Sequence, residues 1–233
     1  MKRDINNMTV PAHPGLLRLP AFCLVIILLC SYCSERPSIR GKEITEDSKL
    51  DTETTGHELK ADTEEAPVTI DAIKKTYAMI SKKFQDGELD STSFKYDCNG
   101  EKGGTVSYFS DKGKLRMVVH RYHEYDHYSA VDRYFVKDST VFFAHLTSIS
   151  WAFEDGSQGT TRDNIKEQRT YLIKQEPVRC LEKKYTLRSD ARNNPAPDSV
   201  PNNEVGCQSV KPLLSSYALL VKYQHKSAPH CLE

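Results

Sequence analysis

The residues with the greatest chemical potential form the nine-residue segment His-Arg-Tyr-His-Glu-Tyr-Asp-His-Tyr, which begins at His120. Three imidazoles and two carboxylates resemble a metal site or an acid–base site in composition. Side chains alternate along a strand, so His120 points away from His123 and His127. The hypothesis of an envelope hydrolase or metal-dependent enzyme therefore depends on His123 and His127 with the carboxylates of Glu124 and Asp126.

Tyrosines give the same segment a second interpretation. Tyr122, Tyr125 and Tyr128 surround the tip of the hairpin that this segment is expected to form. Tyrosine is amphipathic and loses little rotamer entropy on binding, which is why it recurs in protein and glycan contact surfaces. The three tyrosines are therefore candidate binding residues. A solvated hairpin tip without a ligand is the third interpretation.

Other catalytic patterns are missing from the sequence. It contains no G-x-S-x-G or S-x-x-K motif and no glycine-rich phosphate-binding loop. Ser148 and Ser150 cannot pair with His145, because they lie on the opposite face of the same strand. The working hypothesis is a non-catalytic protein that needs no cofactor.

The elements that must position these residues are β-hairpins in series. Breaks rich in polar, Gly and Pro residues at 110–114, 136–140 and 173–177 separate runs of β-branched and aromatic residues. The expected strands cover residues 93–98, 105–110, 115–122, 128–136, 141–151, 164–173 and 178–186. They predict one antiparallel meander of six or seven strands.

Two helices complete the predicted α+β fold. The first follows the potential cap Thr69, because Ile70, Ile73, Tyr77, Ile80 and Phe84 recur at three-and-four spacing. A short C-terminal helix is expected from Pro212, with an apolar face formed by Leu213, Leu214, Tyr217, Leu220 and Val221. Alternation places Val141, Phe143 and His145 on one face of a strand that is apolar on both sides. That strand is expected to be central, with the first helix across one face.

Charge argues against nucleic acid as a partner. The chain has 32 basic and 32 acidic residues, and the predicted globular domain at 68–233 has a net charge of only +3. No basic stripe is present. Residues 34–67 carry ten acidic and five basic side chains with few apolar ones, which predicts a disordered tether.

The N-terminus reads as a targeting signal. Residues 19–30 form an apolar run of twelve residues behind a basic leader, whereas a membrane-crossing helix needs about 20. The following Cys-Ser-Tyr-Cys resembles the cleavage region of a bacterial lipoprotein signal over residues 1–33, with Cys33 as the acylated residue. Cys30, or a simple secreted or uncleaved form, is the alternative, and translation could begin at Met8.

Four further cysteines, Cys98, Cys180, Cys207 and Cys231, are candidates for two disulfides, since an even number in an exported chain favours pairing. Three connectivities are possible. The preferred one joins Cys98 to Cys180 and Cys207 to Cys231, and four free thiols are the alternative. Their spacing does not favour zinc.

Taken together, the Cys33 tether, the first helix and the repeated hairpins with Tyr108-Phe109, Tyr134-Phe135 and Tyr171-Leu172 resemble the uncharacterised lipoproteins common in Bacteroidota. Segments 94–100 and 105–108 are also similar to the opening strands of periplasmic C-type lysozyme inhibitors. The resemblance implies no activity. We expect a lipid-anchored (palmitate-bearing) envelope protein on the extracytoplasmic side, in the periplasm or outer membrane, that binds a protein or glycan.

Overall fold

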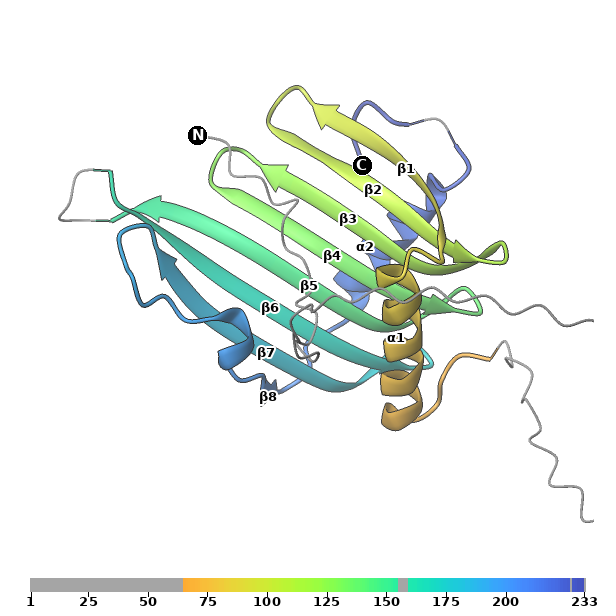
Figure 1. Cartoon of the computed structure of the whole chain (residues 1–233). Coiled ribbons are helices and arrows are strands. Elements are labelled where there is room, and N and C mark those ends of the chain that lie inside the picture. The colour runs from red at the N-terminus through yellow and green to blue at the C-terminus, as the bar shows by residue number, and fades with distance from the viewer. Residues whose placement is uncertain (1–64, 155–158, 227, 233) are drawn as a thin grey trace, which may run out of the picture. The chain divides into compact units, whose positions relative to one another are not determined.

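The computed structural model describes residues 65–154, 159–226 and 228–232. They form an open antiparallel sheet of eight strands with α-helices packed on its two faces (Figure 1). Each strand pairs with its neighbours in the chain, so the sheet order is the chain order. The strands are β1 (Asp90–Cys98), β2 (Lys102–Asp111), β3 (Lys114–Glu124), β4 (Tyr128–Lys137), β5 (Thr140–Phe153), β6 (Thr161–Ile173), β7 (Glu176–Arg188) and β8 (Asn203–Val205); the helices are α1 (Ile70–Gln85) and α2 (Lys211–Lys222), and a 3-10 turn covers Pro197–Ser199. An antiparallel sheet with an N-terminal and a C-terminal helix agrees with the sequence prediction, but the sheet has eight strands rather than six or seven.

Two-residue turns connect β2 to β3, β4 to β5 and β6 to β7. Both residues of each turn have a positive φ, and the pairs are Lys112 and Gly113, Asp138 and Ser139, and Lys174 and Gln175. Positive φ at both positions is the backbone of a type I′ turn, whose twist matches that of the strands it joins. The three predicted hairpins are confirmed.

Each of these hairpins has a register shift just before its turn, directly after an aromatic residue of the first strand. In the second hairpin the shift leaves Phe135 paired with Phe143 but Val136 paired with Val141. Val141 therefore joins the core under α2, on the opposite face from Phe143. The prediction that both lie on one face is wrong, because an inserted residue reverses the alternation of a strand.

The aromatic residues at these shifts form the surface that α1 covers. Tyr77 packs edge-on against Phe135 and Phe143, with ring centroids 4.9 Å apart in both pairs. Phe84 packs against Phe109 in the same way at 4.9 Å. The first two aromatic dipeptides of the sequence thus each supply one ring to this helix, and Tyr171 of the third packs against Phe143 at 4.9 Å.

Helix α2 packs on the opposite face of the sheet (Figure 1). The hydroxyl of Tyr108 donates a hydrogen bond to the carbonyl of Leu220 at 2.6 Å. Tyr217 lies over Tyr134, with ring centroids 5.7 Å apart. In the first two dipeptides, Tyr108-Phe109 and Tyr134-Phe135, the tyrosine therefore faces α2 and the phenylalanine faces α1.

Two disulfides join Cys98 to Cys231 and Cys180 to Cys207. The preferred pairing from the sequence is wrong, because the C-terminal segment returns along β1, where the amide of Asp97 donates to the carbonyl of His230 at 3.1 Å. Disulfides persist in oxidising compartments, so the pair indicates an extracytoplasmic location.

The eighth strand follows from the second disulfide and from an ordered loop. Residues 189–202 are tied back to β7, since the Asn194 amide bonds both the N–H and the carbonyl of Arg188 at 2.8 Å. The Lys183 amine donates to the carbonyl of Pro197 at 2.9 Å. The chain then pairs with β7 over three residues, too short a strand for an alternating pattern to reveal.

Neither helix of the described ranges combines the length and the apolar character needed to cross a bilayer. The predicted signal segment, the lipidation candidates Cys33 and Cys30, and residues 34–64 of the predicted tether lie outside the described residues.

Candidate functional site

The segment that begins at His120 covers the end of β3, the turn at 125–127 and the first residue of β4. It divides between the two faces of the sheet. Tyr122 and Tyr128 lie on the α2 face with their ring centroids 6.1 Å apart, while Tyr125 stands at the tip, 68% exposed and with a φ of 50°. The structure therefore brings two of the three predicted tyrosines together and separates the third from them.

The predicted metal and catalytic residues have other partners. The ring of His127 packs against Trp151 at 4.1 Å, and its Nδ1 lies 3.1 Å from the carbonyl of Trp151. Glu124 pairs with the Lys102 amine at 2.8 Å, and the Trp151 indole donates to the backbone carbonyl of Asp126. No three His, Cys, Asp or Glu side chains are placed to hold a metal ion within the described part of the chain.

The other imidazole of that set, His123, is placed by its strand partner. His123 pairs with Gly103 of β2, and a Cβ at Gly103 would lie 2.9 Å from its ring. The missing side chain makes room for the imidazole against the sheet. His123 thus lies on the face opposite Tyr122.

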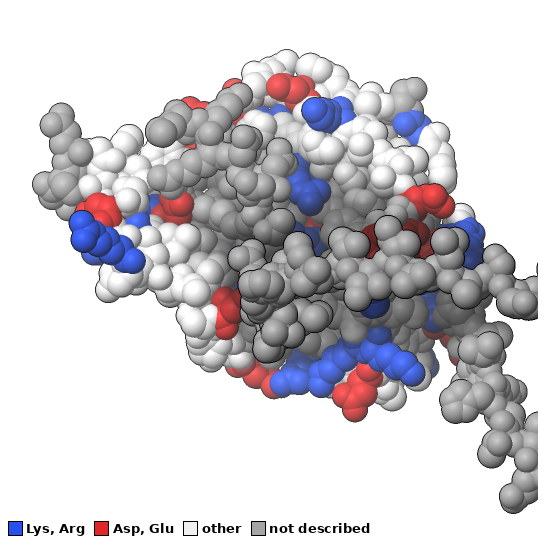
Figure 2. All heavy atoms as spheres, in the orientation of Figure 1, with Lys and Arg blue, Asp and Glu red and all other residues white. Residues whose placement is uncertain are grey.

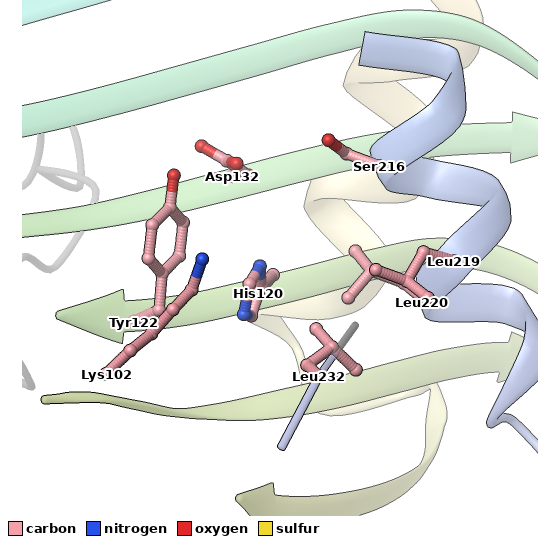
Figure 3. Close-up of a pocket in the computed structure, with 8 residues that line it drawn as sticks. All are labelled: Lys102, His120, Tyr122, Asp132, Ser216, Leu219, Leu220 and Leu232. Atoms are coloured by element: carbon pink, nitrogen blue, oxygen red, sulfur yellow. The ribbon is translucent and has the colours of Figure 1, made fainter. Parts of the chain in front are cut away.

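A cavity of about 110 Å³ lies between the sheet and α2 (Figure 3). In the close-up, polar side chains of the strands face leucines of α2 and of the C-terminal segment. The lining residues are Lys102, His120, Tyr122, Asp132, Ser216, Leu219, Leu220 and Leu232. The cavity therefore has a polar wall and an apolar wall.

Strand register explains why the polar groups converge here. His120 and Asp132 are directly opposite each other on β3 and β4. Tyr122 is opposite Ala130, whose small side chain leaves space on the same face. Leu232 is brought to the cavity by the neighbouring Cys98–Cys231 bridge.

His120 is held as a neutral imidazole. It is 7% exposed, its Nε2 lies 2.8 Å from the hydroxyl of Tyr96, and the ring of Tyr122 stacks on it at 4.4 Å. Burial, followed by the charge of Lys102, lowers its pKa to about 4. At neutral pH the ring can accept or donate a hydrogen bond without carrying charge.

Asp132 behaves in the opposite way. Burial raises its pKa to about 6, although a hydrogen bond with Tyr134 and the charge of Arg133 both act to lower it. The hydroxyl of Tyr134 is also hydrogen-bonded to Ser216 of α2. The carboxyl thus titrates close to neutrality, next to a hydroxyl chain that reaches the helix.

The hydroxyls of Tyr122, which lines the cavity, and of Tyr96, which contacts His120, stay protonated. Burial raises the pKa of Tyr96 to about 12. The pKa of Tyr122 is also raised, by burial first and then by Asp132 and Tyr128. At neutral pH the polar wall therefore offers hydroxyl donors, a neutral imidazole, a carboxylate and the Lys102 amine to a small polar group, while the leucines accept its apolar side.

Sequence reasoning selected Tyr122 and Tyr128 but did not select most of this cavity. The alternation of side chains correctly placed His120 on the opposite sheet face from His123 and His127. That face carries the cavity, which His120 lines. A carboxylate at Asp132, on the inward face between Ala130 and Tyr134, was a readable signal. Nothing in the sequence pattern linked it to Ser216.

Concave sites with one apolar wall and a few converging polar groups are the usual form of ligand-binding pockets.

Comparison of the chain with protein-family models, with curated protein sequences and with solved structures found no match in any of the three.

Proposed function

We propose that this protein is an extracytoplasmic, lipid-anchored binding protein that recognises a glycan without converting it, and that the cavity beneath α2 receives one substituent of that glycan. The observation that carries this proposal is the convergence of Lys102, His120, Tyr122 and Asp132 in one cavity. The alternative is that the same surface binds a protein partner.

The size and the lining of the cavity favour a substituent over a whole ligand. A volume of about 110 Å³ has room for several water molecules or for a group of a few non-hydrogen atoms. Hydroxyls, an imidazole and a carboxylate face leucines across the cavity. A hydroxymethyl or acetamido group of a sugar has a polar and an apolar side that match these two walls.

Titration calorimetry of the full chain in detergent tests this role, with neutral, N-acetylated and acidic mono- and oligosaccharides as ligands. We expect saturable binding of at least one sugar. Tyr122→Phe and Ser216→Ala should each weaken it about tenfold, because each removes one hydrogen bond to the sugar. Tyr125→Phe, at the exposed tip, is the matched control and should bind like the wild type. A panel without any saturable binder would contradict the glycan proposal.

The anchor rests on the sequence of residues 1–33 and agrees with the extracytoplasmic disulfides. One acyl chain holds a protein only marginally, so the several chains of a lipoprotein give stable attachment. Radiolabelled palmitate should enter the wild-type chain and be absent from Cys33→Ala. Label that persists in this variant and disappears in Cys30→Ala would move the anchor to the alternative cysteine.

A hydrolase is the second candidate, and one observation favours it. Asp132, with a pKa near 6, lies opposite His120 in the same cavity. A carboxyl that titrates near the working pH is suited to proton transfer. Turnover of a glycan or ester substrate that is lost in Asp132→Asn, with binding retained, would replace the non-catalytic proposal.

A further inference from the structure

Basic side chains gather on the sheet face that carries α1, opposite the cavity. Arg133, His145 and Arg169 are direct partners across β4, β5 and β6. Arg121 lies diagonally from Arg133 on β3, and Lys183 of β7 lies on the same face. In the space-filling view of this side, Lys and Arg atoms are visible among uncharged ones in the middle of the surface (Figure 2).

The carboxylate of Glu167 balances part of that charge. The Oε1 of Glu167 lies 3.1 Å from the amine of Lys183, and its Oε2 lies 3.4 Å from His145 and 3.7 Å from Arg169. The contacts satisfy Glu167 on the β5 to β7 side of the row. They leave the two arginines of β3 and β4 outside this network.

Arg121 and Arg133 have no carboxylate within 4.0 Å among the residues described. Burial lowers the pKa of Arg121. Burial and then the charge of Arg121 lower the pKa of Arg133, although Tyr77, Glu167 and Asp132 act in the opposite direction. The charge of Arg121 acts unfavourably on Arg133, so an anion beside the two guanidinium groups would offset this repulsion.

The geometry suits an oxyanion. Diagonal neighbours on adjacent strands are about 7 to 8 Å apart. Two long arginine side chains can span this distance and bind the same anionic group. The planar guanidinium binds carboxylate, phosphate and sulfate oxygens in pairs. Arg169 stands two strands from Arg133, about 10 Å away along the sheet, so it can hold a second anionic group.

We propose that Arg121 and Arg133 form a binding site for an oxyanion group of a ligand, a phosphate, a sulfate or a carboxylate, with Arg169 available for a second such group. The site lies on the face opposite the cavity and shares no residue with it. It is therefore independent of the proposed glycan-binding role.

Calorimetry of the full chain with inorganic phosphate, inorganic sulfate or succinate, at an ionic strength matched with sodium chloride, tests the site. We expect saturable binding of at least one probe. Arg121→Gln and Arg133→Gln should each weaken its Kd at least tenfold, and Arg192→Gln, an exposed arginine of the 189–202 loop, should leave it unchanged. Binding of phosphate and sulfate alone selects a tetrahedral ligand group, whereas binding of succinate selects a carboxylate.

Thermal unfolding gives a readout that a structural role would not produce. Without added anion, Arg133→Gln should melt at the wild-type temperature or above, because it relieves repulsion from Arg121. The rise in Tm that the bound probe causes should be lost in the same variant. Arg133→Lys keeps the charge but not the fork, and provides a folded variant with severalfold weaker binding if the glutamine change unfolds the protein.

The site would be refuted by an absence of binding above the chloride control, by unchanged affinity in both glutamine variants, or by an equal loss in Arg192→Gln. Tyr122→Phe and Ser216→Ala should bind the probe normally. A failure of the glycan proposal and a failure of the oxyanion site are therefore told apart by different variants.

Discussion

The two faces of this sheet carry two carboxyl groups with opposite behaviour, the half-buried Asp132 and the buried Glu167. On the α2 face, burial raises the pKa of Asp132 to about 6. On the α1 face, burial acts in the same direction on Glu167, but hydrogen bonds from His145 and Lys183 and the charge of Lys183 outweigh it and lower the pKa to about 2. The backbone is shared, so the neighbours that alternation places on each face decide which form of the carboxyl is stable.

The difference also separates two ways of burying polar groups. The α2 face uses neutral partners, such as the Tyr96–His120 pair and the Tyr108 hydroxyl on α2. The α1 face uses ion pairs of Glu167 with Lys183 and Arg169. Neutral networks leave a pocket for a polar ligand, whereas an ionic face with excess cations is suited to an anionic one.

The largest expected effect comes from the α2 face, where one disulfide holds the C-terminal segment. Replacing both Cys98 and Cys231 by Ala opens a loop with a sequence separation of 133, and should lower the free energy of unfolding by about 4 to 5 kcal/mol. Chemical denaturation measures this loss, and hydrogen exchange should rise first around α2. Removing the Cys180–Cys207 pair, with a separation of 27, should cost about 3.5 kcal/mol. A larger loss of stability on removing the Cys180–Cys207 bridge would contradict the expectation that the longer loop contributes more.

Glu167→Gln should break the ionic α1 face. The change leaves the amine of Lys183, only 4% exposed, without its carboxylate, and should cost about 3 kcal/mol in chemical denaturation. Because the folded-state pKa is lowered, this contribution is present above pH 4.5 and is lost as the pH falls towards 2. Glu204→Gln, from an exposed pair with Arg179, is the control and should cost less than about 0.5 kcal/mol. Equal losses would show that the α1 network has no special stability.

Asp132→Asn should reveal how the α2 face balances its protons. The raised pKa of Asp132 contributes stability below pH 3.8 that is lost as the pH rises through about 6. The lowered pKa of His120 contributes stability above pH 6.5 that is lost as the pH falls through about 4. The two contributions oppose each other between about pH 4 and 6 in the wild type.

With the Asp132 contribution removed, the variant should be about 1 to 2 kcal/mol more stable than the wild type at pH 7.5, and about equal at pH 4. Denaturation at both pH values measures this. The exposed Asp190→Asn serves as the control and should not change the difference between the two pH values. A variant that is less stable than the wild type at pH 7.5 would mean that the carboxylate is better satisfied than its burial indicates.

Thr69→Ala should have the smallest effect and should be confined to α1. The hydroxyl of Thr69 accepts a hydrogen bond from the amide of Ala72 at 3.1 Å, and loss of such a cap costs about 1 kcal/mol. Hydrogen exchange should rise in the first turn of α1 and stay unchanged in α2. Thr69→Ser, which keeps the hydroxyl, should behave like the wild type. Equal effects on both helices would show that the faces unfold as one unit.

Much of the fold was predictable because its information is local. Three hairpins are predicted within short windows of sequence, from turn pairs such as Lys112 and Gly113 and from the aromatic residues before them. The spacing from Ile70 to Phe84 announces α1 in the same way. The register shifts were not predictable, because a run of apolar residues such as Val141 to Phe143 reads equally well with or without an inserted residue.

The candidate sites were only partly predictable. Alternation correctly separated His120 from His123, and the tyrosines Tyr122 and Tyr128 proved to be neighbours. Sequence analysis did not select Asp132 or the basic row of Arg121, Arg133 and Arg169. Whether a charged residue can bind a ligand depends on which charges lie opposite it on the neighbouring strands. That is a property of strand register rather than of composition.

The sequence by itself determined the hairpin meander, the two amphipathic helices and the presence of four pairable cysteines, because turn preferences and periodicity act between residues close in the chain. The tertiary structure alone decided that Cys98 meets Cys231, that Lys102, Asp132 and Ser216 share one cavity, and that three arginines share one face. These groups come from segments far apart in sequence, and only the pairing of the strands and the return of the C-terminal segment bring them together.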